Sequence, residues 1–169
     1  MDIRAIFSLI FVALSVALAV CGRIAFRSRK PIGVPLGRML VTLIPPLAGN
    51  LLIISATTKL PATIGCYLYY IGIDFTAFSL LRYTLSYCNI PWKANKARVF
   101  VLSLLGLDVF QLLANIFFGH AFSLERIELY GKPYYRMVPY MPQNLHRLLV
   151  YGVLAAGSGA DREIGRAHV

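Results

Sequence analysis

The chain has 169 residues, of which 58% are hydrophobic and only 14% are charged, and its mean hydropathy is +0.67. Soluble domains carry roughly 25% charged residues, and a soluble chain of this length could not bury so much apolar surface. The same figures exclude a disordered chain, which needs low hydrophobicity. We therefore expect an integral membrane protein.

The net charge is +10, from 17 Lys and Arg against 7 Asp and Glu. Most of the basic residues between the apolar runs gather in two short segments: Arg23, Arg27, Arg29, Lys30 and Arg38 in the first, and Lys93, Lys96 and Arg98 in the second. Short basic loops beside hydrophobic helices follow the positive-inside rule, and no basic helix or aromatic-basic surface lies outside them. We therefore expect the lipid bilayer as a partner and no nucleic acid.

The first apolar run covers residues 5–26 and is long enough for a spanning helix, which needs about 20 residues. Ala17-Leu18-Ala19 resembles a signal-peptidase site, so a cleaved signal peptide is the alternative. However, Asp2 and Arg4 before the run cancel in charge, whereas five basic residues, from Arg23 to Arg38, lie at its end and beyond it. This polarity favours an uncleaved helix with its N-terminus outside.

Three further runs predict spanning helices at residues 34–56, 62–87 and 97–118. Pro45-Pro46 should kink the second helix, and Pro61 should open the third. The three loops between these helices carry five basic residues, Lys59 alone, and three basic residues. Loops one and three should then face the cytoplasm, and the N-terminus and loop two should face outward.

The segment after the fourth run mixes acidic and basic residues, as an outer loop without charge bias would. Ile127-Glu128-Leu129-Tyr130 and Tyr134-Tyr135-Arg136-Met137-Val138 flank Gly131-Lys132-Pro133. This pattern predicts a short extracytoplasmic β-hairpin over residues 123–138. Because an isolated hairpin is marginally stable in water, its tyrosines should rest on the helix ends.

A fifth helix is predicted at residues 142–156, where Gly157-Ser158-Gly159 should end it. Its fifteen residues reach only about 22 Å at 1.5 Å per residue, so we interpret it as a partial span. Residues 157–169 are predicted to be a non-helical tail. Residues 164–169 resemble a translated sequencing adapter, and we hypothesise that they are not native and that the natural chain continues. The predicted fold is an all-α membrane bundle of four complete transmembrane helices and a partial fifth, with the hairpin between helices four and five.

Few polar side chains interrupt the apolar runs. Asp108, Gln111 and Asn115 share one face of the fourth helix, and Tyr70 and Asp74 share a face of the third. A mid-helix carboxylate costs about 2.5–3.5 kcal/mol on insertion scales, so these side chains should avoid lipid. They either join helices through hydrogen bonds or form a ligand or proton site in the outer half of the bundle. The candidate binding residues are Asn50, Tyr70, Asp74, Asp108, Gln111 and Asn115.

The sequence contains no nucleophile elbow, Walker loop or zinc-binding helix pattern. The three histidines are scattered along the chain. Cys21, Cys66 and Cys88 form no CxxC pair, so we interpret the cysteines as small hydrophobic residues within helices. We therefore expect no catalytic activity, metal site or cofactor in this segment.

Two segments carry a resemblance to a known family: Tyr69-Tyr70-Ile71-Gly72-Ile73-Asp74 in an aromatic-rich helix, and Phe118-Gly119-His120-Ala121-Phe122 before the Tyr-rich hairpin. They resemble the seven-helix N-terminal sensor region of bacterial histidine kinases, which also precedes diguanylate cyclase and cyclic-di-GMP phosphodiesterase domains. The similarity covers about residues 36–155. It implies an outside N-terminus, seven helices, a cytoplasmic output domain and a homodimeric full-length protein. The chain departs from this pattern because it holds four helices, a partial fifth and no output domain.

The function expected from the sequence is that of a signal-sensing region in the cytoplasmic (inner) membrane of a bacterium, responding to a small-molecule or membrane-derived signal. In the alternative, the chain is a small carrier or channel subunit that moves a solute through the same polar interior. Kinked helices and mid-depth carboxylates fit both functions. An inverted repeat would favour the carrier, and the sequence shows none.

Overall fold

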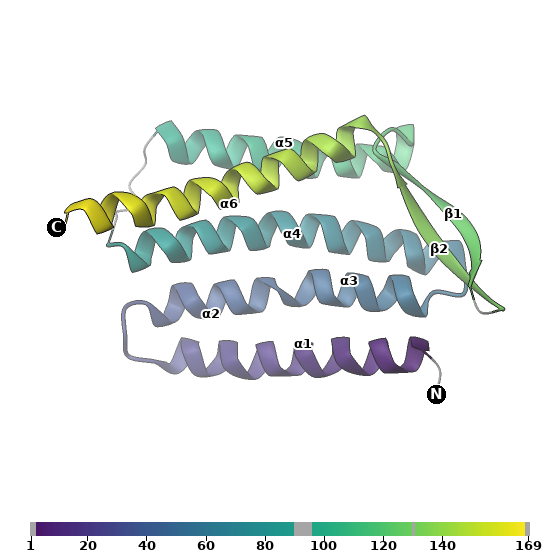
Figure 1. Cartoon of the computed structure of the whole chain (residues 1–169), viewed down its shortest axis with the longest axis horizontal. Coiled ribbons are helices and arrows are strands. Elements are labelled where there is room, and N and C mark those ends of the chain that lie inside the picture. The colour runs from purple at the N-terminus through teal and green to yellow at the C-terminus, as the bar shows by residue number, and fades with distance from the viewer. Residues whose placement is uncertain (1–2, 90–95, 130, 168–169) are drawn as a thin grey trace.

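The computed structural model describes residues 3–89, 96–129 and 131–167 and is mostly helical. In chain order the elements are α1 (Ile3–Arg27), α2 (Gly33–Thr42), α3 (Ile44–Ser55), α4 (Lys59–Tyr87), α5 (Lys96–Phe118), β1 (Phe122–Leu129), β2 (Lys132–Pro139) and α6 (Met141–Ala167). Figure 1 shows the helices side by side with their axes roughly aligned, and the two strands at one end. The prediction of a helical protein with one small antiparallel hairpin is confirmed.

Four helical stretches are long and apolar enough to cross a membrane. Among the described residues they are Ile3–Arg27, Gly33–Ser55, Lys59–Tyr87 and Val99–Phe118. These stretches agree within a few residues with the helices predicted from the sequence. The third differs slightly, because α4 begins at Lys59 and Pro61 lies inside its first turn, where no intrahelical hydrogen bond is lost.

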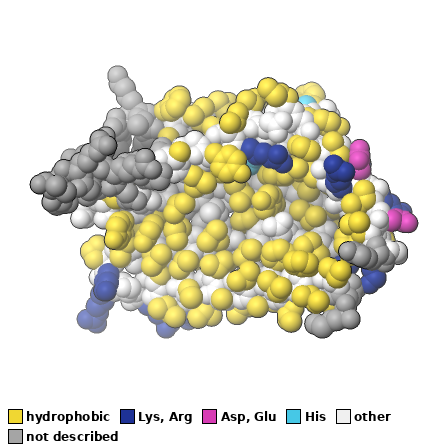
Figure 2. All heavy atoms as spheres, in the orientation of Figure 1, with side chains coloured by type: hydrophobic (Ala, Val, Ile, Leu, Met, Phe, Trp, Pro, Cys, Tyr) yellow, Lys and Arg dark blue, Asp and Glu magenta, His cyan; other side chains and the backbone are white. Residues whose placement is uncertain are grey.

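The exposed surface of these helices is strongly apolar. In the most hydrophobic stretch of α1 only 6% of the residues are buried. On α5, Phe117 and Phe118 are 84% and 78% exposed. Figure 2 shows hydrophobic side chains over most of one face of the bundle and acidic side chains at the hairpin end. A patch of this extent needs an apolar environment or a partner to cover it.

The second predicted helix is divided in two at Leu43, between α2 and α3. Pro45 and Pro46 occupy the first turn of α3, so the predicted kink is present as a break. Gly72 of α4 lies against this break, because a Cβ at Gly72 would lie 2.6 Å from Cδ of Pro46.

Close contact between α3 and α4 depends on two further glycines. A Cβ at Gly49 would lie 2.6 Å from the carbonyl oxygen of Gly65, and a Cβ at Gly65 would lie 2.7 Å from the carbonyl oxygen of Gly49. Small residues that let two helix backbones approach closely are typical of helix pairs in membranes.

The hairpin forms where the sequence predicts it. Phe122 pairs with Pro139 and Leu129 pairs with Lys132, so the paired strands extend one residue beyond 123–138 at each end. Gly131 has a φ of +70°, and this left-handed conformation in the turn is one that glycine adopts without steric cost.

A phenylalanine of the hairpin packs against α4. The ring of Phe122 lies 5.3 Å from the ring of Tyr67 and 5.9 Å from that of Tyr70, both on α4. Of the hairpin tyrosines, Tyr134 makes the expected contact with a helix end, because the guanidinium of Arg4 lies 4.2 Å from its ring centre.

α6 corrects the prediction for the C-terminal segment. It continues to Ala167, so the predicted helix end at residue 156 and the non-helical tail are wrong for residues 157–167. Gly157 and Gly159 each cost only about 1 kcal/mol in a helix, and no proline follows to end it. Residues 168–169 lie outside the described residues.

Candidate functional site

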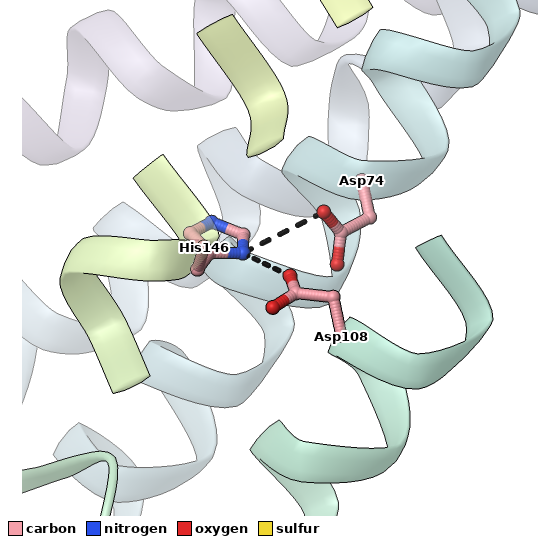
Figure 3. Close-up of side chains that lie close together, drawn as sticks. All are labelled: Asp74, Asp108 and His146. Atoms are coloured by element: carbon pink, nitrogen blue, oxygen red, sulfur yellow. Dashed lines mark hydrogen bonds and ion pairs between the residues drawn. The ribbon is translucent and has the colours of Figure 1, made fainter. Parts of the chain in front are cut away.

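Three buried ionisable side chains from three helices meet in the interior: Asp74 of α4, Asp108 of α5 and His146 of α6 (Figure 3). Their exposed fractions are 2%, 7% and 2%. We call these residues the Asp–Asp–His cluster. Because ionisable groups are costly to bury, a cluster of three needs partners that compensate the lost hydration.

The packing of α4, α5 and α6 places the cluster between two apolar regions. On α4, Asp74 lies between Tyr70 and Ala77, and on α5, Asp108 lies between Leu105 and Leu112. Tyr70 and Leu112 belong to an apolar cluster with Cys66, Ala121 and Phe122, and Ala77 and Leu105 belong to another with Leu81, Val150 and Val153. The three polar side chains are therefore enclosed by hydrophobic contacts along the helix axes.

The imidazole of His146 joins the two carboxylates. Its Nδ1 is hydrogen-bonded to Oδ2 of Asp108 and lies 3.6 Å from Oδ1 of Asp74 (Figure 3). One oxygen or nitrogen atom from each of the three residues lies within 4.8 Å of the others.

Two neighbours hold the cluster and connect it to the hairpin. Nε2 of Gln111 donates a hydrogen bond of 3.2 Å to Oδ1 of Asp108. The ring of Tyr70 meets the imidazole of His146 edge-on, with ring centres 5.3 Å apart, and the Tyr70 hydroxyl donates to Sδ of Met137 on β2 at 2.6 Å. Tyr70 therefore contacts both His146 of α6 and Met137 of β2.

Asp74 has an incomplete set of contacts. Within the described part of the chain, neither of its carboxylate oxygens has a hydrogen-bond partner. Gln143 lies one turn before His146 on α6, is fully buried, and has no hydrogen-bond partner among the described residues for either amide atom. Unsatisfied buried polar groups are rare in native proteins, and a bound ion or water is a usual explanation.

Two grooves lead to the cluster from different sides of α4. A groove of about 300 Å³ between α4 and α6 is lined by Tyr70, His146 and Arg147 among others. A second, of about 280 Å³ between α4 and α5, is lined by Asp74, Phe75 and other mostly apolar residues. The cluster is thus buried but borders open space on two sides.

The structure brings together four of the six candidate residues. Asp74 and Asp108 are in the cluster, and Tyr70 and Gln111 contact its members. Asn50 is half-buried on α3, a helix that contributes no residue to the cluster.

Asn115 has a different environment, at the start of the hairpin. Its Oδ1 accepts hydrogen bonds from the backbone N–H groups of Ala121 and Phe122, at 2.6 and 3.4 Å. Its Nδ2 donates to the Tyr67 hydroxyl and to the carbonyl oxygen of Phe122, at 3.1 and 3.2 Å. These contacts favour a structural role for Asn115, which links α5 to the hairpin, over a role in ligand binding.

Sequence reasoning missed His146 and Gln143. Both lie on the predicted fifth helix, whose short length does not predict a complete span, and the spacing of the three histidines along the chain matches no metal-ligand pattern. The available signal was a Gln and a His at i and i+3 on one face of a largely apolar helix. Spacing along the chain carries no information about residues that meet across three helices.

The cluster can hold protons or a cation. Two neighbouring carboxylates repel each other when both are ionised, so a proton, an imidazolium or a metal ion must compensate their charge. Two carboxylates and an imidazole are also ligands that divalent transition metals accept. Among the described residues, no other group of this kind could hold a metal ion.

Comparison with protein-family models, with curated proteins and with solved structures finds no match to this chain. The resemblance to a bacterial sensor region therefore stays a prediction from the sequence.

Proposed function

We propose that this chain is the membrane-embedded signal-sensing region of a bacterial signal-transduction protein, placed in the cytoplasmic membrane with its N-terminus and hairpin outside. Four helices of sufficient length and hydropathy and their exposed apolar surfaces support the membrane setting. The basic α1–α2 loop supports the orientation, since it lies at the end of the bundle opposite the hairpin (Figure 1).

The observation that carries the proposal is the Asp–Asp–His cluster, because it joins three helices through charges that a signal can alter. Ionisable groups buried in such helices mark functional sites by default. A signal that binds one arrangement of α4, α5 and α6 more tightly than another shifts the population between them. α6 extends from the cluster to the end opposite the hairpin (Figure 1), so it would carry the change toward the cytoplasm.

The test uses the gene as it occurs in its genome. DNA that encodes a kinase or nucleotide-cyclase domain in frame downstream of codon 163 is the result expected for a sensor. With that parent protein in membrane vesicles, Asp74→Asn and Asp108→Asn should change the output activity without lowering the amount of protein in the membrane. Ser86→Ala is the matched control, because Ser86 is exposed near the far end of α4. An output that the cluster variants leave unchanged would contradict the proposal.

The alternative is a carrier or channel subunit, which the two grooves beside the cluster favour. A stop codon directly after the chain, together with solute or proton flux into liposomes that contain the purified protein, would support it. Flux that Asp74→Asn abolishes would place the cluster on the transport path.

A further inference from the structure

We propose that Asp74, Asp108 and His146 bind a divalent transition-metal ion, with Zn²⁺ as the ion that fits the three donors best. The inference rests on the proposed function, since it identifies the bound ion as the signal that the region detects. No residue spacing along the chain indicates this site, because each ligand comes from a different helix.

The chemistry of the donors selects the class of ion. Zn²⁺ accepts imidazole nitrogen and carboxylate oxygen, and sites with three protein ligands leave a fourth position for water or another group. Ca²⁺ and Mg²⁺ instead need six or more oxygen ligands or several retained waters. An imidazole with two carboxylates therefore favours a transition metal over either of these ions.

One of the separations between donor atoms is close to that of a tetrahedral site. Ligand atoms about 2.0–2.1 Å from a tetrahedral ion lie about 3.3–3.5 Å from one another. Nδ1 of His146 and Oδ1 of Asp74 are 3.6 Å apart. Oδ2 of Asp108 is hydrogen-bonded to the same Nδ1, so these two atoms would have to move apart for a metal ion to take the place of the proton between them.

Charge and missing hydrogen bonds supply the second, independent argument. Among the described residues no Lys or Arg forms an ion pair with either carboxylate, and a divalent cation would balance two carboxylates beside a neutral imidazole. Asp74 is nine-tenths buried or more, points at His146 and Asp108 (Figure 3), and finds no hydrogen-bond partner for either oxygen in the described part of the chain. Binding a metal ion would give these oxygens the partner that they lack.

Gln111 would act as a positioning residue for the site. Its amide holds Oδ1 of Asp108 at 3.2 Å, which leaves Oδ2 for the metal. Removing a side chain that hydrogen-bonds a metal ligand commonly lowers the affinity for the metal by about 10–100-fold. Gln111→Leu should therefore weaken binding by about that factor without removing a ligand.

The experiment uses the full chain purified in detergent micelles and freed of metal with a chelator. Zn²⁺ titrated against a competing indicator should bind with one ion per chain. Asp74→Asn, Asp108→Asn and His146→Gln should each weaken binding by at least about 100-fold, more than the loss of an outer partner. His120→Gln is the matched control, because it removes an imidazole that lies outside the cluster.

Two further measurements separate ligation from loss of fold. Co²⁺ should give the visible absorption of a four-coordinate site without the charge-transfer bands of a thiolate ligand. Zn²⁺ should raise the Tm of the wild type and of His120→Gln, because a ligand that binds only the folded state stabilises it, and should not raise the Tm of His146→Gln. Absence of saturable binding, or binding that His146→Gln and Asp74→Asn leave intact, would overturn the proposal, and a cluster that takes up only protons gives the first of these results.

The experiments distinguish a failure of the metal site from a failure of the proposed signalling function. Zn²⁺ binding at the cluster of a parent protein whose output activity the cluster variants leave unchanged refutes the signalling function and keeps the metal site. An output that depends on Asp74 while purified protein binds no Zn²⁺ refutes the metal site and keeps the signalling function.

Discussion

Asn115 is the residue for which the structure changes the interpretation most. Its side-chain oxygen satisfies two backbone N–H groups at the junction of α5 and β1, where Gly119, at a φ of +61°, ends the helix as a C-terminal glycine does. A side chain with four hydrogen bonds inside the protein is already satisfied and has little capacity left for a ligand.

Replacing this side chain should therefore cost stability. Asn115→Leu leaves the N–H of Ala121 buried without its acceptor, and we expect a loss of about 1–3 kcal/mol in the free energy of unfolding. This loss can be measured by unfolding the protein in detergent micelles with a denaturing detergent. Ser103→Ala is the control, because Ser103 is exposed on the same helix. Equal stability of the two variants would show that Asn115 does not anchor the hairpin.

At this scale the sequence could predict which residues are unusual but not which of them meet. Asp74 and Asp108 stand out because carboxylates are rare in apolar helices. The face that each occupies follows from helical periodicity. Their contact with His146 depends on the rotation of α4, α5 and α6 about their axes, which periodicity of one helix does not determine.

At the scale of elements, the length and hydropathy of the four long apolar runs predicted their helices to within a few residues. The end of α6 could not be predicted in the same way, because two glycines lower helix propensity without excluding a helix. The break at Leu43 follows from Pro45 and Pro46. The close approach of Gly49 and Gly65 does not, since a glycine in a sequence does not reveal whether another backbone lies against it.

The close contact between α3 and α4 can be tested by comparing two glycine substitutions, one inside the contact and one outside it. Gly65→Ala places a methyl group 2.7 Å from the carbonyl oxygen of Gly49, so the helices must separate, and we expect a loss of about 1–3 kcal/mol as in other overpacked sites. Gly106→Ala on α5 meets nothing within 4 Å and should be neutral or gain up to about 1 kcal/mol from helix propensity. The same unfolding assay compares them, and a Gly65→Ala variant as stable as Gly106→Ala would refute the close packing.

At the scale of the molecule, the exposed apolar surface is the property on which every functional statement depends. Side chains such as Phe110, Phe117 and Phe118 are 70–84% exposed, and water is a poor solvent for so many of them. A lipid bilayer would cover such a surface, and a helix satisfies its own backbone hydrogen bonds there. The chain should therefore remain in the membrane pellet after an alkaline carbonate wash, and its release as intact protein into the supernatant would contradict the membrane assignment.

The proposed orientation of the molecule rests on the distribution of basic residues and can be tested at two exposed positions. Glu128 lies on the hairpin, and Lys30 lies in the loop between α1 and α2, which is at the other end of the bundle. In a cysteine-free variant of the chain, Glu128→Cys should react with a membrane-impermeant maleimide in intact spheroplasts, whereas Lys30→Cys should react only after permeabilisation, because positive loops are retained in the cytoplasm. The opposite pattern would invert the proposed orientation and place the basic loop outside. Labelling of both positions in intact spheroplasts would mean that no bilayer separates them. The burial of the Asp–Asp–His cluster would then have to be explained for a protein surrounded by water.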